Sequence, residues 1–178
     1  MEIEKTQFEG VYIINNFNAS DNRGLFVKTF NKKLFKENKI YFDIRESYYS
    51  VSKKDVIRGM HFQLPPHDHE KLVYVALGEI IDVVLDLRQN SATYRKCMSV
   101  KLSAENKKSI FIPKGLAHGF KSIKNETITV YNVGSEYDSQ ADYGIKYNSI
   151  DFDWGISNPI VSERDKSFQK LNNFKSTF

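Results

Sequence analysis

The chain has 178 residues, the size of one domain, and its 40% hydrophobic and 13% aromatic residues are enough to fill a globular core. This apolar content excludes an intrinsically disordered protein, and the apolar runs are too short to cross a bilayer. The net charge of +4 comes from 26 basic residues interspersed with 22 acidic ones, which is typical of a solvated surface and not of a nucleic-acid-binding protein. The single cysteine, Cys97, excludes an intrachain disulfide, and the N-terminal residues lack the pattern of a signal peptide. We therefore expect a cytoplasmic protein.

Short segments rich in Val, Ile, Tyr, Phe and Thr recur about every ten residues and are separated by turn residues, which predicts many short β-strands. The two segments on either side of Gly78 are predicted to form a β-hairpin with a tight turn. The predicted strands are GVYIINNF, GLFVKTF, RESYYSVS, KLVYVAL, EIIDVVLDL, CMSVKLS, KSIFIPKG, HGFKSI and TITVYNVG.

Helical patterns are limited to two segments. Residues 32–40 place Leu34 and Phe35 on one face of a short helix. Residues 162–174 are predicted to form a C-terminal helix, because Ser162 precedes Asp165 by three residues, the spacing of an N-cap. Many strands with few helices predict a single all-β domain over residues 1–178, folded as a β-sandwich or barrel.

All four histidines lie in the middle third of the chain. In the segment RGMHFQ, strand alternation predicts that His61 and Gln63 point to the same face, with Arg58 near them. An imidazole is suited to proton transfer near neutral pH, and Arg58 and Lys71 would stabilise negative charge that develops beside it. A hydrogen-bonded core histidine with a surface lysine explains the same spacing equally well.

A metal site is the alternative use of the other histidines. The pair His67 and His69, followed by His118 in PKGLAH, is similar to the two metal-binding motifs of cupins. The glutamate expected shortly after such a pair is missing, because Val73 and Tyr74 stand there. The alternative is that His67 and His69 belong to a proline-rich loop, where they line a substrate site or lie on the surface.

Two further segments carry candidate site residues. Tyr131 and Tyr137 flank a predicted turn, and a phenol can donate a proton to a carbanion or enolate, although core packing is the simpler role. In the turn DNRGLF, Arg23 would contact a phosphate while Phe26 stacks on a base, and an ordinary turn is the alternative.

Taken together, several long motifs resemble the dTDP-4-dehydrorhamnose 3,5-epimerase family from about residue 5 to residue 168. The resemblance implies a cupin jelly roll that forms a homodimer and uses no cofactor or metal. It also implies an isomerase that inverts C3, C5 or both in a 4-keto sugar linked to a nucleoside diphosphate. The motifs are DNRGLF, VIRGMHFQ, KLVYVALGEIIDVVLDLR, SATYRK, VKLSAENKKSIFIPKGLAHGF, the pair Tyr131 and Tyr137, and PIVSERD.

The resemblance also implies a role for each matching residue. His61 would be the base that removes the proton at C3 or C5, and Lys71 would hold the C4 oxygen as it becomes an enolate. Tyr131 would return a proton from the opposite face, and Asp165 would orient His61 and balance its charge. The substrate-binding residues would be Arg23, Phe26, Lys28, Glu46, Tyr48, Arg58, Gln63, His118, Tyr137 and Arg164.

The chain departs from the family pattern where relatives read the nucleotide. Lys28 stands where the family has Glu, while Glu46 and Tyr48 stand where it has Gln and Asn. These changes predict a nucleotide other than dTDP, such as GDP, because a site with altered polar groups rejects the original base. His69, where Gln is commoner, predicts a larger sugar such as a heptose, in the biosynthesis of a surface polysaccharide such as a capsule or lipopolysaccharide.

Two rival functions follow from the same residues. The first is a metal-dependent cupin enzyme that uses His67, His69 and His118. The second is a sugar-nucleotide-binding module without catalysis, or a related ketoisomerase.

Overall fold

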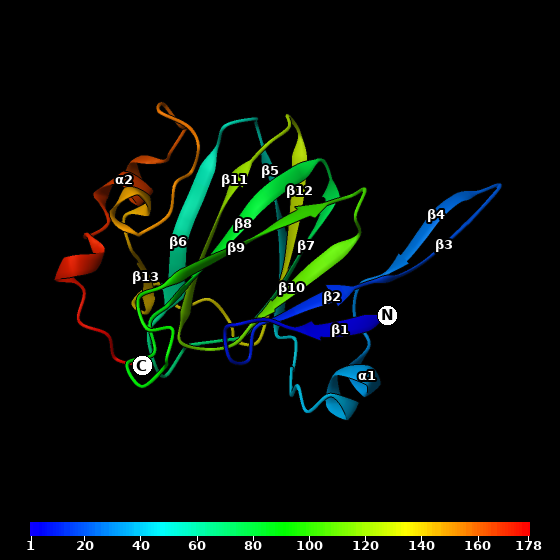
Figure 1. The fold of residues 1–178 in the computed structure, drawn as a ribbon, viewed down its shortest axis with the longest axis horizontal. Coiled ribbons are helices and arrows are strands. Elements are labelled where there is room, and N and C mark those ends of the chain that lie inside the picture. The colour runs from blue at the N-terminus through cyan, green and yellow to red at the C-terminus, as the bar shows by residue number, and fades with distance from the viewer.

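The computed structural model describes all 178 residues as a sandwich of two antiparallel sheets (Figure 1), which confirms the all-β prediction. No helix is long and apolar enough to span a membrane. The first sheet has the order β1 (Glu2–Lys5), β2 (Tyr12–Asn15), β10 (Lys108–Ile112), β7 (Lys71–Leu77), β12 (Thr127–Val133) and β5 (Glu46–Ser52). The second has the order β13 (Asp142–Gly144), β6 (Ile57–Gln63), β11 (Leu116–Ser122), β8 (Glu79–Asp86) and β9 (Cys97–Ser103).

A separate two-stranded hairpin, β3 (Phe17–Asp21) and β4 (Gly24–Lys28), projects away from the sandwich (Figure 1). The helical elements are short and lie outside the two sheets. They are α1 (Lys32–Glu37), the 3₁₀ turn η1 (Tyr147–Ser149), α2 (Glu163–Ser167) and the 3₁₀ turn η2 (Leu171–Asn173).

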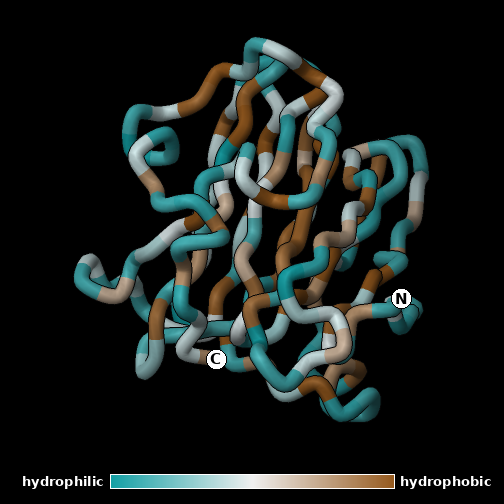
Figure 2. The backbone as a smooth tube through the Cα atoms, turned by 60° about the vertical axis from the view of Figure 1, so that its left-hand side comes forward, coloured by the Kyte–Doolittle hydropathy of each residue, from teal (hydrophilic) through white to brown (hydrophobic).

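Apolar residues concentrate along the strands and leave the connecting loops mostly polar (Figure 2). The largest core cluster joins Val73 and Val133 of the first sheet to Ile80 and Val84 of the second. Burying such a side chain contributes about 1.5–3 kcal/mol. A second cluster packs the other face of the second sheet against the C-terminal segment and includes Val83. Strand β8 is therefore covered on both faces, which explains its nearly continuous apolar sequence.

The predicted hairpin around Gly78 is wrong. Strand β7 pairs with β10 and β12, whereas β8 pairs with β11 and β9, so the chain crosses from one sheet to the other at this glycine. Gly78 has a φ of +83°, and a Cβ there would collide with Thr127. Both strands are paired along both edges with other segments, and these pairings replace the local one.

Both predicted helices are present, but the C-terminal one is shorter than predicted. The side chain of Asn31 caps α1, and the Ser162 hydroxyl accepts the Asp165 N–H at 3.1 Å to cap α2, as its spacing predicts. Helix α2 ends at Ser167, and the chain then extends so that Gln169 forms a parallel bridge with Ile145. This long-range pairing ends the helix, and a local sequence pattern carries no sign of it.

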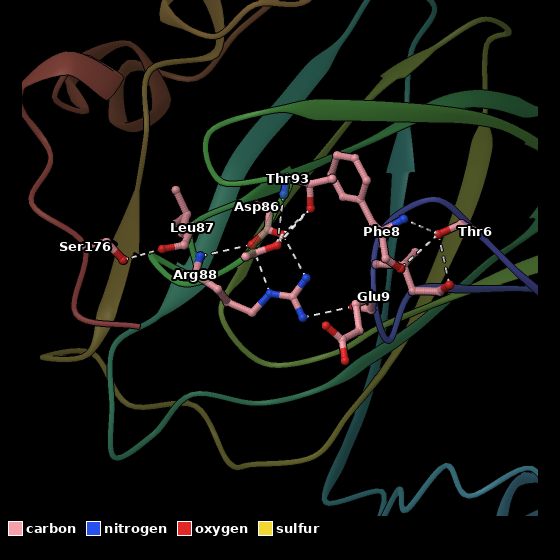
Figure 3. A network of polar contacts seen from close by, with 10 residues as sticks. Thr6, Phe8, Glu9, Asp86, Leu87, Arg88, Thr93 and Ser176 are labelled. Carbon is pink, nitrogen blue, oxygen red and sulfur yellow. Dashed lines mark hydrogen bonds and ion pairs between the residues drawn. The ribbon is translucent and has the colours of Figure 1, made fainter.

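A hydrogen-bond network around the buried Asp86 stabilises the C-terminal end of β8 (Figure 3). Asp86 is fully buried and accepts hydrogen bonds from Arg88 at 2.8 and 2.9 Å and from Ser91 and Thr93 at 2.7 Å. Burial alone would raise the pKa of Asp86, but these hydrogen bonds hold the pKa below its ordinary value. Arg88 also donates to the carbonyl of Glu9 at 2.9 Å, so the network joins β8 to the loop between β1 and β2.

Candidate active site

A cavity of about 390 Å³ is lined by residues of both sheets and of the loops at their ends. Its lining contains every predicted site residue outside the β3–β4 hairpin except Asp165, which lies behind His61. The lining residues are Glu46, Tyr48, Ser50, Arg58, His61, Phe62, Gln63, His69, Lys71, His118, Phe120, Tyr131, Val133, Tyr137, Asp142 and Arg164.

His61 on β6 and Asp165 on α2 form a closely held pair. The Nε2 atom of His61 lies 2.9 Å from Oδ1 of Asp165, and the other carboxylate oxygen accepts the N–H of Gly59 at 2.9 Å. Asp165 is 3% exposed. Although burial alone would raise the pKa of Asp165, its hydrogen bonds with His61 and Gly59 hold that pKa below its ordinary value. The carboxylate is therefore charged, so Nε2 carries the ring proton and Nδ1 keeps its lone pair.

The electrostatics of His61 suit a general base. Burial lowers the pKa of His61 below its ordinary 6.5, and the positive charges of Lys71 and Arg164 lower it further against the opposing effect of Asp165. The imidazole is consequently neutral near neutral pH and free to accept a proton, while the adjacent carboxylate would stabilise the imidazolium that forms.

Lys71 supplies a buried positive charge to the cavity from the opposite sheet. It is the first residue of β7 and is 7% exposed, and its ammonium group makes one hydrogen bond, to the carbonyl of His61 at 3.3 Å. Burial lowers the pKa of Lys71 to about 8, although Asp142 and Asp82 raise it. Lys71 is therefore mostly protonated at neutral pH and keeps N–H groups for an oxygen in the cavity.

Tyr131 faces the same cavity from β12, in the first sheet. Its ring stacks on that of Tyr48 at a centroid distance of 5.0 Å, and its hydroxyl shares a hydrogen bond with Ser50 Oγ at 3.3 Å. Burial raises the pKa of Tyr131 well above its ordinary value, so the phenol keeps its proton at neutral pH. A neutral base on β6 thus faces a protonated acid on β12 across the cavity.

The three remaining histidines each have a separate partner. His118 Nε2 lies 2.7 Å from Oδ2 of the fully buried Asp82, and His67 Nε2 lies 3.5 Å from Oδ2 of Asp138. His69 Nδ1 lies 2.6 Å from Ser135 Oγ, and burial lowers the pKa of His69 to about 3. No three His, Cys, Asp or Glu side chains are grouped to hold a metal ion. The predicted metal alternative therefore lacks the geometry that it requires.

Gln63 connects the loop that follows β6 with the loop that follows β12. Its side-chain nitrogen donates to the carbonyl of His67 at 2.9 Å, and its oxygen accepts the N–H of Asp138 at 2.7 Å. Gln63 lines the cavity, as its alternation with His61 predicts, but its amide is engaged by these two loops.

Charged and aromatic groups form one side of the cavity lining. The Tyr137 hydroxyl donates to Asp142 Oδ2 at 3.2 Å, and Arg164 donates to the same oxygen at 2.5 Å. The backbone N–H of Tyr137 donates to Glu46 Oε1 at 3.0 Å.

Four polar residues at the site are not predicted from the sequence, and only one of them has a detectable signal. Ser50 alternates with Tyr48 on a strand, which would place it on the same face. The other three, Asp82, Ser135 and Asp142, approach the site residues through sheet pairing and loop geometry that no local motif encodes.

Three predicted substrate-binding residues lie away from the cavity of their own chain, on the projecting hairpin. Arg23 is exposed and paired with Asp21 at 2.6 Å, and Phe26 is 56% exposed. The amino group of Lys28 lies 6.0 Å from the centre of the Phe17 ring. Within one copy of the chain, the structure does not bring these side chains to the other site residues.

Comparison with known proteins gives one consistent result. The family model described as dTDP-4-dehydrorhamnose 3,5-epimerase matches residues 5–173. The epimerase of that name from Shigella flexneri is 38% identical over 176 residues, with 96% of each chain covered. The one from Methanothermobacter thermautotrophicus is 39% identical over 172 residues, covering 94% of this chain and 92% of that protein.

Solved structures agree. The Bacillus anthracis epimerase with TDP and PPi bound superposes with a TM-score of 0.92 at 32% identity, over 96% of this chain and 99% of that one. The Legionella pneumophila enzyme in complex with dTDP-4-keto-L-rhamnose also gives 0.92 at 32% identity, over 98% of this chain and 94% of that one. The chain belongs to the dTDP-4-dehydrorhamnose 3,5-epimerase family of isomerases, with the cupin-type β-sandwich that its motifs imply.

Proposed function

We propose that this protein inverts C3, C5 or both in a 4-keto sugar carried on a nucleoside diphosphate, by proton transfer through an enolate. One observation carries the proposal: a neutral His61 and a protonated Tyr131 face one cavity from opposite sheets, together with the ammonium group of Lys71. Family membership and the ligands of the related structures support it.

The first step is removal of the proton beside the keto group. His61 takes this proton, and the electrons of the broken C–H bond form the C=C bond of an enolate while negative charge moves to O4. Lys71 donates hydrogen bonds to that oxygen, and a buried cation stabilises it more than water would. Asp165 stabilises the imidazolium and holds its orientation.

The second step returns a proton on the other face of the sugar. Tyr131 gives its phenolic proton to the same carbon, so that a C–H bond forms and the keto group is restored. His61 alone would return the proton to the face from which it came. Inversion therefore needs both residues, whereas exchange with solvent needs only His61.

Two nucleotides, dTDP and GDP, are candidates for the carrier of the sugar. The related structures hold dTDP-type ligands, which favours dTDP. Glu46 favours GDP, because a carboxylate in the cavity lining can accept two hydrogen bonds from the guanine edge, which presents adjacent N–H donors, but only one from thymine. Arg58 and Arg164, which also line the cavity, would contact the diphosphate.

We also propose that the protein acts as a homodimer. The projecting hairpin exposes the apolar side chains of Phe17, Leu25 and Phe26, which are 48%, 51% and 56% exposed. Phe17 and Phe26 lie on one face of the hairpin and Leu25 on the other. Contact with a second copy would cover these side chains and carry Arg23 and Phe26 toward a cavity that their own chain does not bring them to. A role in the biosynthesis of a surface polysaccharide, from a deoxysugar or a heptose, stays a prediction.

The test is incubation of the protein with dTDP-linked and GDP-linked 4-keto sugars in deuterated water, followed by NMR. The proposal predicts deuterium at C3 or C5 together with inverted product, with the preferred nucleotide giving the higher kcat/KM. Tight binding without deuterium would instead identify a binding module. Activity that a chelator removes and a metal restores would identify a metal-dependent enzyme.

A further inference from the structure

Each inversion transfers one proton from the His61 side of the cavity to the Tyr131 side. It leaves His61 protonated and Tyr131 as a phenolate. Before the next inversion, His61 must release its proton and Tyr131 must regain one. A group that connects Tyr131 to solvent is therefore part of the reaction cycle, provided that the proposed function holds.

The surroundings of the Tyr131 hydroxyl leave few routes for that proton. The side chain is 8% exposed, with Tyr48 stacked on its ring and His118 edge-on at 6.0 Å. Its one hydrogen-bond partner in the protein is Ser50 Oγ, at 3.3 Å. A sugar bound against Tyr131 would cover the open side of the phenol, and Ser50, which lines the same cavity from the edge strand β5, is the protein hydroxyl that remains in contact with it.

Ser50 lies where solvent can reach it. Strand β5 is at the edge of the first sheet and pairs only with β12, and Ser50 is half-buried. The exposed Arg58 extends along the same strand, where it donates to Ser52 Oγ at 3.1 Å and to the carbonyl of Val51 at 3.3 Å. Its positive charge lowers the pKa of Tyr131 against the larger effect of burial, so it would also stabilise the phenolate.

We propose that the Ser50 hydroxyl relays a proton from solvent to the Tyr131 phenolate. The Oγ–H bond of Ser50 breaks as the O–H bond of Tyr131 forms, and the Ser50 oxygen takes a proton from a water molecule. The hydroxide that remains is neutralised by the proton that His61 releases to solvent. The protein then returns to its starting state with no net gain or loss of protons.

The test compares Ser50→Val with Ser50→Thr, because valine and threonine have nearly the same shape and only threonine keeps the hydroxyl. Ser47→Val is the matched control on the exposed part of the same strand. Product is measured by rapid quench at substrate concentrations several times that of the active sites. The relay predicts that Ser50→Val gives a burst of one inversion per site and then a steady rate lower by about tenfold or more. KM should fall by the same factor and leave kcat/KM unchanged, because the slowed step follows the inversion. Ser50→Thr and Ser47→Val should show no such burst.

Two results would overturn the relay. If Ser50→Val turns over at the wild-type rate, water reaches Tyr131 directly. If its first and later turnovers slow equally, Ser50 only holds the phenol in place. Thermal melting of each variant checks that it is folded. Absence of inversion by the wild-type protein is a different result, which would overturn the proposed function itself.

Discussion

The imidazole of His61 and the carboxylate of Asp165 lie 2.9 Å apart although 104 residues separate them in the chain. Helix α2 carries Asp165, and its cap by Ser162 and the bond from the Gly59 N–H fix the carboxylate behind the ring. The C-terminal segment therefore holds the proposed base of β6 in its reactive tautomer.

Asp165→Asn should lower kcat by about 10²- to 10⁴-fold with little change in KM. The amide can still accept the Gly59 N–H, but its NH₂ group would then face His61 and place the ring proton on Nδ1, where the lone pair is needed. Steady-state kinetics measure the effect, with Glu163→Gln on the exposed face of α2 as the control. A kcat within threefold of wild type would show that Asp165 has only a structural role.

The pH dependence of kcat/KM should be bell-shaped. Burial first, and then the nearby cations, lower the pKa of His61 below 6.5, so activity should fall only as the pH drops below that value and the base becomes protonated. Burial lowers the pKa of Lys71 to about 8, so activity should fall again as the pH rises through about 8 and the ammonium loses its charge. Activity that still increased at pH 10 would exclude a role for charged Lys71.

The hairpin proposal predicts that replacing Leu25 and Phe26 together by serine shifts a dimer to the monomer. The double replacement removes exposed apolar side chains from both faces of the hairpin, whichever face a second copy covers. Analytical ultracentrifugation measures the change, and Tyr41→Ser, which alters an exposed aromatic ring elsewhere, is the control. A wild-type protein that sediments as a monomer at micromolar concentration would contradict the proposal.

Asp86→Ala should lower the free energy of unfolding by about 3 kcal/mol, because it removes several hydrogen bonds to a buried charge. No residue of this network (Figure 3) lines the cavity, so kcat should not change. Hydrogen bonds hold the pKa of Asp86 below its ordinary 3.8 despite burial. The stability that the ionised Asp86 gives to the fold is therefore complete above pH 3.8 and is lost as the pH falls through the pKa of Asp86 in the folded protein. Asp151→Asn, at an exposed aspartate, is the control. Denaturant titration would detect both effects, and an Asp86→Ala variant as stable as this control would refute them.

Local patterns predict the fold class and draw attention to His61, Gln63 and Lys71, whereas the roles of the site residues follow from the family resemblance. The alternation that places His61 and Gln63 on one face follows from strand geometry alone, and both residues line the cavity. The crossing at Gly78 could not be predicted, because an apolar strand pattern does not specify which sheet the strand joins. Likewise, Asp142 reaches Arg164 only through the pairing of β13 with β6.

The central claim is that His61 removes the proton and Tyr131 returns it from the other face. The most direct measurement compares deuterium uptake and inversion by His61→Ala and Tyr131→Phe in deuterated water, with the wild-type protein beside them. We predict no deuterium at C3 or C5 with His61→Ala, and deuterium with little inverted product with Tyr131→Phe. Deuterium uptake by His61→Ala, or inversion at the wild-type rate by Tyr131→Phe, would contradict the account.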